Sequence, residues 1–193
     1  MEMISMPPKA KITKEMVIDA GLNIVREDGQ ENLNVRSIAA KLGCSTQPVM
    51  YHYETVNDLK ADIYAAADSF HTGFITSPEQ GTDDPMLSIG LRYIRFADEE
   101  KNLFRFLFQS DKFRNTGFRE LIGAEGNPAI KPLCEAAKLT EAQAKEVFAT
   151  LFICVHGIAS LLANNSIEYD EEYFSGLLRN TLFGAVAVLK GSN

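Results

Sequence analysis

The sequence contains few of the features that define secreted or membrane-spanning proteins. Its 193 residues include three cysteines, Cys44, Cys134 and Cys154, whose odd number and wide spacing do not indicate a disulfide framework. The longest apolar runs, such as FGAVAVL at 183–189, are too short to span a bilayer, and the N-terminus lacks the apolar core of a signal peptide. We therefore expect a protein of the reducing cytoplasm.

Recognisable catalytic and metal-binding motifs are also missing from the sequence. It contains no HExxH, no CxxC, no glycine-rich phosphate loop and no nucleophile elbow. Cys154 and His156 lie two residues apart on a predicted helix, so their side chains point in different directions and cannot share a metal ion. No pair of carboxylates lies in an apolar context that would separate their pKa values. We expect neither an enzyme nor a cofactor or metal site.

The composition fits a globular protein with an acidic surface. Apolar residues make up 46% of the chain and charged residues 23%, so disorder is not expected. The net charge of −7, from 19 basic and 26 acidic residues, argues against a protein that coats nucleic acid without specificity. A local basic face is still compatible with this balance, because salt screens each charge beyond roughly 10 Å.

Apolar residues recur with helical spacing along the whole chain, which predicts an all-α fold. Thr13 and Asn34 are expected to cap helices at their N-terminal ends, and Gly29 and Gly43 to follow helix ends. The linker TSPEQGTDDP at 76–85 is expected to separate a domain of residues 1–75 from one of residues 76–193. Helices are predicted over 13–28, 35–42, 56–71, 86–99, 101–109, 140–164 and 170–190, with a less regular stretch at 116–138.

The stretch GCSTQPVMYHY at 43–53 predicts a helix-turn-helix. Ser45 or Thr46 is a good N-cap, which places Pro48 in the first turn of a second short helix, where its missing N–H has no helical partner to lose. A short helix, a turn containing Gly43 and a second short helix form the helix-turn-helix pattern. In that motif the second helix presents its N-terminal side chains to base edges in the major groove.

Several polar side chains in and around this motif are candidates for DNA contacts. Gln47 can pair with adenine through two hydrogen bonds, and Tyr51 and His52 have polar tips that suit phosphate or base contacts. The full candidate set is Asn34, Arg36, Ser45, Thr46, Gln47, Met50, Tyr51, His52 and Lys60. Lys9, Lys11, Lys14 and Lys41 are further possible phosphate ligands, although the three upstream lysines fit an ordinary solvated face equally well. By contrast, the spacing of Ile38, Ala39, Leu42, Val49 and Tyr53 predicts core positions.

Residues 11–70 resemble the DNA-binding domain of the TetR/AcrR family of transcriptional regulators. The resemblance rests on NVRSIAAKLGCSTQPVMYHYETVNDLKADIY at 34–64, which follows the family's T-V-R-x-I-A-x-x-L-G-V-S pattern and its tyrosine-rich recognition helix. It implies an all-α homodimer with N-terminal DNA-binding heads on a palindromic operator. It also implies a C-terminal domain that binds an unidentified small-molecule effector, usually in a repressor that the effector releases from DNA.

Two positions depart from the family pattern. Met50 stands where a tyrosine is usual, and Val56 replaces a frequent lysine. Residues 1–72 contain seven basic and ten acidic residues, a net charge of −3, so we expect modest affinity and a shallow dependence on salt. These features leave an alternative: a helical small-molecule-binding protein that has lost DNA binding.

The second half of the chain is rich in phenylalanine and predicts either an apolar ligand pocket or a well-filled core. Ser88, Arg92, Arg95 and Glu99 form the polar stripe of helix 86–99. His156 could bind a ligand, although a satisfied core histidine is the more frequent case. The candidate ligand-binding residues are Arg92, Tyr93, Phe96, Phe104, Phe108, Phe148, Phe152 and His156, and Phe113 and Phe118 add to the aromatic content.

The last two predicted helices each carry a second apolar face, which favours a four-helix interface between two copies of the chain. The VHG at 155–157 resembles the W-H-G type of C-terminal domain in this family, with Val155 in place of tryptophan. A homodimer also suits the helix-turn-helix, because one short recognition helix reads few bases. The candidate interface residues are Ala149, Ile153, Gly157, Ser160, Asn180 and Gly184.

Overall fold

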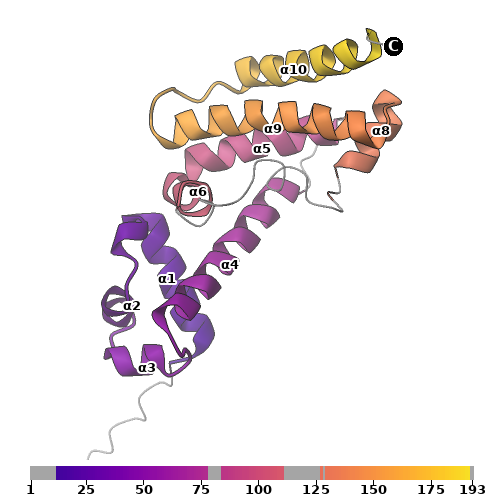
Figure 1. Cartoon of the computed structure of the whole chain (residues 1–193). Helices are drawn as coiled ribbons and strands as arrows, with labels where there is room; N and C mark the ends of the chain where they lie inside the picture. The colour runs from indigo at the N-terminus through magenta and orange to yellow at the C-terminus, as the bar shows by residue number, and fades with distance from the viewer. Residues whose placement is uncertain (1–11, 78–83, 111–126, 128, 192–193) are drawn as a thin grey trace, which may run out of the picture. The chain divides into compact units, whose positions relative to one another are not determined.

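The computed structural model describes residues 12–77, 84–110, 127 and 129–191 (Figure 1). Within these ranges every regular element is a helix, which confirms the predicted all-α class. The chain divides into two compact units, Met1–Asp68 and Ser69–Asn193.

The first unit begins with α1 (Lys14–Asp28), a short 3-10 helix η1 (Gln30–Asn32) and α2 (Val35–Lys41). The predicted ends of α1 are confirmed. Thr13 Oγ1 accepts a hydrogen bond from Met16 N at 3.3 Å, and Gly29 follows the helix with φ of 88°, a value that glycine adopts without strain.

The helix-turn-helix forms where the sequence predicts it. Asn34 Oδ1 accepts hydrogen bonds from Arg36 N and Ser37 N, both at 3.0 Å, and Ser37 Oγ accepts one from Asn34 N at 3.1 Å, so α2 starts with a capping box. Gly43 has φ of 64° and turns the chain into α3 (Thr46–Met50), whose N-cap is Ser45. Pro48 is the third residue of α3 and lies in its first turn.

The core of the first unit is formed by buried aliphatic side chains from all four of its α-helices. Gly21 of α1 allows a close approach to α4 (Val56–Thr76), because a Cβ atom at Gly21 would lie 2.3 Å from Ile63 Cδ1. Lys14 pairs with Asp62 across the same two helices at 2.6 Å. The side chains that are at most 3% exposed include Val17, Ile24, Val25, Ile38, Ala39, Val49, Leu59 and Ile63.

Helix α4 extends five residues beyond its predicted end at residue 71. Its last two turns belong to the second unit, in which the ring centroids of Phe70, His71 and Phe74 lie 6.2, 4.8 and 5.4 Å from that of Phe96. Arg92 Nη1 also donates to the Phe74 carbonyl oxygen at 2.8 Å. The division between compact units therefore falls inside α4, after Asp68, whereas the predicted boundary lies after residue 75.

The second unit consists of α5 (Pro85–Glu99), α6 (Lys101–Phe108), α8 (Ile130–Ala137), α9 (Glu141–Ala163) and α10 (Glu171–Gly191). Helix α9 packs against all four of the others (Figure 1). Of the predicted stretch at 116–138, the part before residue 127, together with Phe113, Phe118 and linker residues 78–83, lies outside the described residues.

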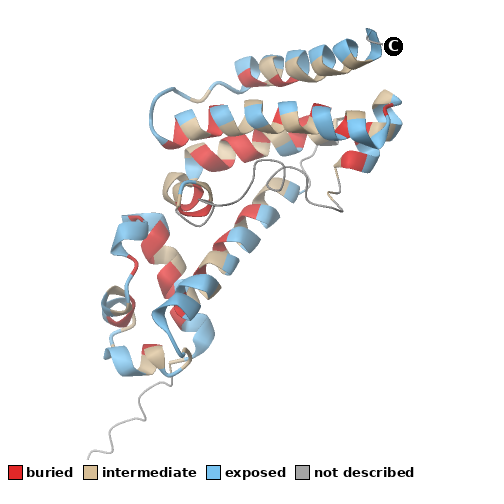
Figure 2. Ribbon diagram, viewed as in Figure 1, coloured by how far each residue is buried: buried red, intermediate tan, exposed pale blue. Residues whose placement is uncertain are grey.

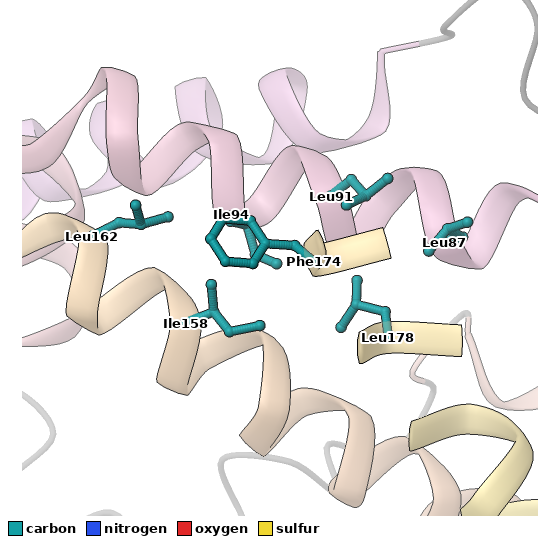
Figure 3. Close-up of a cluster of buried hydrophobic side chains, with 7 residues drawn as sticks. All are labelled: Leu87, Leu91, Ile94, Ile158, Leu162, Phe174 and Leu178. Atoms are coloured by element: carbon teal, nitrogen blue, oxygen red, sulfur yellow. The ribbon is translucent and has the colours of Figure 1, made fainter. Parts of the chain in front are cut away.

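The main core of this unit lies where α5, α9 and α10 meet. Figure 3 shows the buried side chains from these three helices pointing toward one another: Leu87, Leu91, Ile94, Ile158, Leu162, Phe174 and Leu178. A second cluster joins α8 to α9 through Ile130, Leu133, Leu139, Ala144, Val147 and Leu151. Among the described residues, α9 alone is long and apolar enough to cross a membrane.

Candidate DNA-binding helix and ligand cavity

Helix α3 combines a buried anchor with an exposed polar surface. Val49 is fully buried, whereas Ser45, Thr46 and Gln47 at the start of the helix are exposed and Tyr51 at its end is 81% exposed. The exposed side chains carry hydroxyl and amide groups, which are the groups that read base edges and phosphates. The fold thus presents the predicted recognition residues to solvent without using them in the core.

Two of the basic side chains near the helix-turn-helix are held in ion pairs. Lys14 Nζ lies 2.6 Å from Asp62 and 5.4 Å from the centroid of the Tyr53 ring, and Lys41 Nζ lies 2.5 Å from Glu27. Arg36 and Lys60 are exposed, while Lys9 and Lys11 lie outside the described residues. A phosphate that recruited Lys14 or Lys41 would have to compete with a carboxylate.

Three predicted DNA-binding residues are also hydrogen-bonded or half-buried within the first unit, and their role in DNA binding stays a prediction. The amide oxygen of Asn34 accepts the two capping hydrogen bonds of α2, and its Nδ2 donates to Asn32 O at 3.2 Å. His52 is half-buried, with Nε2 3.0 Å from the Ile12 carbonyl oxygen, and Met50 is also half-buried. The capping bonds of Asn34 stabilise the start of α2, and the contact of His52 Nε2 holds its ring against the residue that precedes the Thr13 cap of α1.

The second unit contains an apolar cavity of about 210 Å³. The residues that line the cavity come from the last turn of α4, from α5 and its N-cap, and from α9 and α10. They are Ile75, Asp84, Met86, Leu87, Ile89, Gly90, Tyr93, Phe148, Leu151, Phe152, Val155, Leu178, Arg179 and Leu182. Of the predicted ligand-binding residues, three line this cavity: Tyr93, Phe148 and Phe152.

The other predicted ligand-binding residues lie in the ring cluster next to the cavity or cap a helix. Phe96 and Phe104 are fully buried and fill the core. Phe108 and His156 pack against Tyr93, with ring centroids 5.5 and 6.1 Å away. The guanidinium of Arg92 binds the Phe74 carbonyl, so Arg92 stabilises the C-terminal end of α4.

A buried polar pair joins this ring cluster to the cavity wall. Tyr93 Oη lies 3.0 Å from His156 Nδ1. Burial raises the pKa of Tyr93 and lowers the pKa of His156, so both groups are held neutral. A neutral tyrosine and a neutral imidazole can then satisfy each other with one hydrogen bond.

The aliphatic walls of the cavity were not among the predicted ligand-binding residues. Met86, Leu87 and Gly90 come from α5, and Leu178 and Leu182 come from α10, more than 80 residues later in the sequence. Their spacing indicates only a buried helix face. A glycine within such a face is a weak indication of a cavity. Gly90 indicates one only once the structure shows that Leu178 of α10 faces it.

The predicted dimer-interface residues lie along an outer apolar face of α9 and α10, which also carries large exposed side chains. The ribbons of both helices in Figure 2 include positions coloured as exposed and half-buried. Ile153 is 53% exposed and Phe183 66% exposed, and Leu161 and Val188 are similarly accessible. Gly157, Asn180 and Gly184 are exposed and Ala149 and Ser160 are half-buried. Their role at an interface stays a prediction.

The described residues contain no group of three or more histidine, cysteine or acidic side chains placed to hold a metal ion.

Comparisons with known proteins support the fold expected from the sequence. A scan against protein-family models finds no match. A TetR-like transcriptional regulator from Rhodococcus sp. RHA1 has a similar crystal structure, with a TM-score of 0.64 and 14% identity over 95% of this chain and 99% of that chain. The multidrug binding protein EbrR, solved with imidazole, gives a TM-score of 0.47 and 19% identity, with 87% of this chain and 93% of that chain covered.

One curated protein is also similar over nearly the full length. The uncharacterized HTH-type transcriptional regulator YobS of Bacillus subtilis (strain 168) is 21% identical over 175 residues, covering 89% of this chain and 90% of YobS. The all-α architecture is thus confirmed as the TetR-like fold.

Proposed function

We propose that this chain, which has the fold of the TetR-like transcriptional regulators, is a cytoplasmic homodimer that binds double-stranded DNA and responds to a small-molecule effector. The observation that carries the proposal is the exposed polar surface of α3 on a capped helix-turn-helix. A buried Val49 anchors that helix, while Thr46, Gln47 and Tyr51 are directed to solvent. In this arrangement α3 enters the major groove and α2 crosses the DNA backbone.

The residues of the proposed DNA contact have different tasks. Gln47 and Thr46 contact base edges, and Ser45, Tyr51, Arg36 and Lys60 contact phosphates. Asn34 and His52 also hold the motif in place, because Asn34 caps α2 and His52 Nε2 contacts the Ile12 carbonyl oxygen of the first unit. Because Lys14 and Lys41 each already pair with a carboxylate, we expect a shallow salt dependence.

The apolar cavity of the second unit is the proposed effector site. Its wall includes Ile75 in the last turn of α4, and the same helix begins at Val56 in the first unit. A ligand that contacts Ile75 therefore acts on the helix that continues into the DNA-binding unit. The effect of effector on DNA affinity and of DNA on effector affinity must then be equal, because the coupling is reciprocal.

The outer apolar face of α9 and α10 is the proposed homodimer interface. Exposed residues as large as Phe183 and Ile153 on adjacent helices need a cover, and an isologous contact between two copies provides one. Two α3 helices in a symmetric dimer would read two half-sites of a palindromic operator.

The first test is fluorescence anisotropy of the full chain with labelled DNA from immediately upstream of its own gene. It uses two salt concentrations and scrambled DNA as the control. The proposal expects tighter binding to the upstream DNA than to the scrambled DNA. Because the operator could lie elsewhere, the absence of a preference is followed by selection from random DNA sequences. If no sequence is enriched, the protein does not bind DNA with sequence specificity. The alternative, a helical small-molecule-binding protein that has lost DNA binding, would then be the function.

The variant Gln47→Ala tests the assigned recognition residue. Loss of a paired contact to a base should weaken specific binding by about 1–3 kcal/mol without changing the affinity for scrambled DNA. Gln30→Ala is the matched control, since Gln30 is also an exposed glutamine of the first unit but lies on η1, outside the motif. Equal effects of the two changes would contradict the assignment.

A further inference from the structure

We infer that the cavity takes a small, uncharged ligand built around a single aromatic ring. This inference rests on the proposed function for the role of the ligand as effector, and it adds the chemical class of that ligand. Three properties of the cavity carry it: its volume, the rings in its wall and the positions of its charged and polar groups.

The volume limits the ligand to roughly one ring with a short substituent. The cavity measures about 210 Å³. A closed apolar cavity of roughly 150 Å³ can hold benzene, while pockets for drug-sized ligands usually measure roughly 300–1,000 Å³. The cavity is therefore larger than benzene requires and too small for most multi-ring compounds.

The wall favours an aromatic ligand over an aliphatic one. Phe148 and Phe152 lie nearly parallel, with centroids 6.4 Å apart and planes at 27°. Tyr93 meets Phe152 at 66° with a centroid distance of 6.3 Å, and all three rings line the cavity. A ligand ring can then stack on one wall ring and meet another edge-on, which are the two favourable geometries for aromatic pairs. The thioether of Met86, which also lines the cavity, can contact a ring favourably.

The polar groups of the wall are already engaged or lie toward solvent, which disfavours a charged ligand. Tyr93 Oη is hydrogen-bonded to His156 Nδ1 at 3.0 Å. Asp84 Oδ1 accepts hydrogen bonds from Met86 N and Leu87 N at 3.1 and 3.2 Å, so this carboxylate caps α5. Arg179, the other charged residue of the lining, is exposed. An ionic group placed among the aliphatic and aromatic side chains of the wall would lose its hydration.

Three probes with the same ring separate these possibilities: benzyl alcohol, benzoate and benzylamine, each titrated into the full-length protein at neutral pH by isothermal calorimetry. We expect benzyl alcohol to bind at least about tenfold more tightly than the anion or the cation. Cyclohexylmethanol, which replaces the aromatic ring by a saturated one, should bind several-fold more weakly than benzyl alcohol. Failure of benzyl alcohol to bind would overturn the inference. Binding of either ion as tight as that of benzyl alcohol would overturn it too.

Filling the cavity tests where the ligand binds. A Cβ atom at Gly90 would lie 3.1 Å from Leu178 Cδ1 and 3.5 Å from Val155 Cγ2, so Gly90→Leu puts a side chain into the cavity. The matched control is Gly73→Leu, because Gly73 is an exposed helical glycine of the same unit with nothing within 4 Å of an added Cβ. Gly90→Leu should weaken benzyl alcohol binding at least about tenfold, and Gly73→Leu should leave it unchanged. If Gly90→Leu does not fold, Leu182→Phe fills the cavity from α10. Unchanged binding in a folded filling variant would refute the location.

The readouts separate this inference from the proposed function. Calorimetry with the four probes reports ligand class without DNA, whereas anisotropy reports DNA reading without ligand. A protein that binds benzyl alcohol and reads no DNA would retain the ligand class and lose the proposed function. A protein that reads DNA and prefers benzoate would retain the function and lose the ligand class.

Discussion

The hydrogen bond between Tyr93 and His156 is a single contact with two consequences. It satisfies two polar groups among the rings of Phe104, Phe108 and Phe152, where an unpaired polar atom would be costly. It also fixes the orientation of the Tyr93 ring, which lines the cavity. From the sequence, a histidine that is hydrogen-bonded within the core is the more frequent case at this position. The structure shows that the partner of His156 is Tyr93, which lies 63 positions away in the sequence.

The burial of His156 makes folding stability depend on pH. Burial lowers the pKa of His156 below its ordinary value of 6.5, so the unfolded chain binds this proton more readily than the folded chain. The contribution of His156 to the free energy of unfolding is complete above pH 6.5. It is lost as the pH falls through the pKa that His156 has in the folded protein. Glu171, whose pKa is held below 4.5 chiefly by its hydrogen bond from Arg95, loses its contribution only at lower pH.

The free energy of unfolding should fall between about pH 7.5 and about pH 5.5, and we expect this fall to be smaller in His156→Gln than in the wild type. Urea unfolding of the wild type and the variant at both pH values measures it. His52→Gln is the control, since His52 is a half-buried histidine of the first unit with its own hydrogen bond. An unchanged pH dependence in His156→Gln would show that this histidine does not control acid stability.

At the scale of elements, the local signals in the sequence predicted the helix starts well. Thr13, Asn34 and Gly43 act within one turn of their own helix ends, so no distant residue is needed to interpret them. The end of α4 was predicted too early because its last turns are stabilised by tertiary contacts of Phe70 and Phe74 with Phe96. The cavity was predicted only in part, since a ring that fills a core and a ring that lines a pocket have the same spacing.

The contact of α1 with α4 at Gly21 leads to a prediction for Gly21→Ala. The new methyl group would meet Ile63 Cδ1 at 2.3 Å and Cγ1 at 2.9 Å, and Ile63 is fully buried. Overpacking costs about 1–3 kcal/mol and exceeds the gain in helix propensity of at most about 1 kcal/mol. The free energy of unfolding should therefore fall, as measured by urea denaturation with circular dichroism.

The matched change Gly73→Ala should have the opposite sign. An added Cβ at this exposed position of α4 meets nothing within 4 Å, so only the gain in helix propensity of up to about 1 kcal/mol applies. A destabilisation of the same size in both variants would mean that the close approach of α1 and α4 is not the cause.

At the scale of the whole molecule, the apolar character of α9 exceeds what one chain can bury. Only 39% of its most apolar window is buried within the chain, although the helix lies at the centre of its bundle. Its two apolar faces were visible in the sequence, and the structure places one of them inside and leaves Ile153 on the outside.

Ile153→Asp should therefore separate the proposed homodimer. A charge in the middle of an apolar interface, present twice by symmetry, should weaken association by about 3 kcal/mol or more. Sedimentation velocity over a range of concentrations measures the effect. Ile167→Asp serves as the control, because Ile167 is also an exposed isoleucine but lies in the turn between α9 and α10. A wild-type chain that sediments as a monomer would remove the interface altogether.

The missing side chain at Gly90 has an evolutionary consequence. Because the cavity owes part of its space to this one position, replacement by alanine, valine or leucine would shrink it by one, three or four carbon atoms. Gly90 belongs to the second compact unit and α3 to the first. Under the proposed function, a change of this one codon would alter which effector fits the cavity and leave the DNA-contacting residues of α3 unchanged.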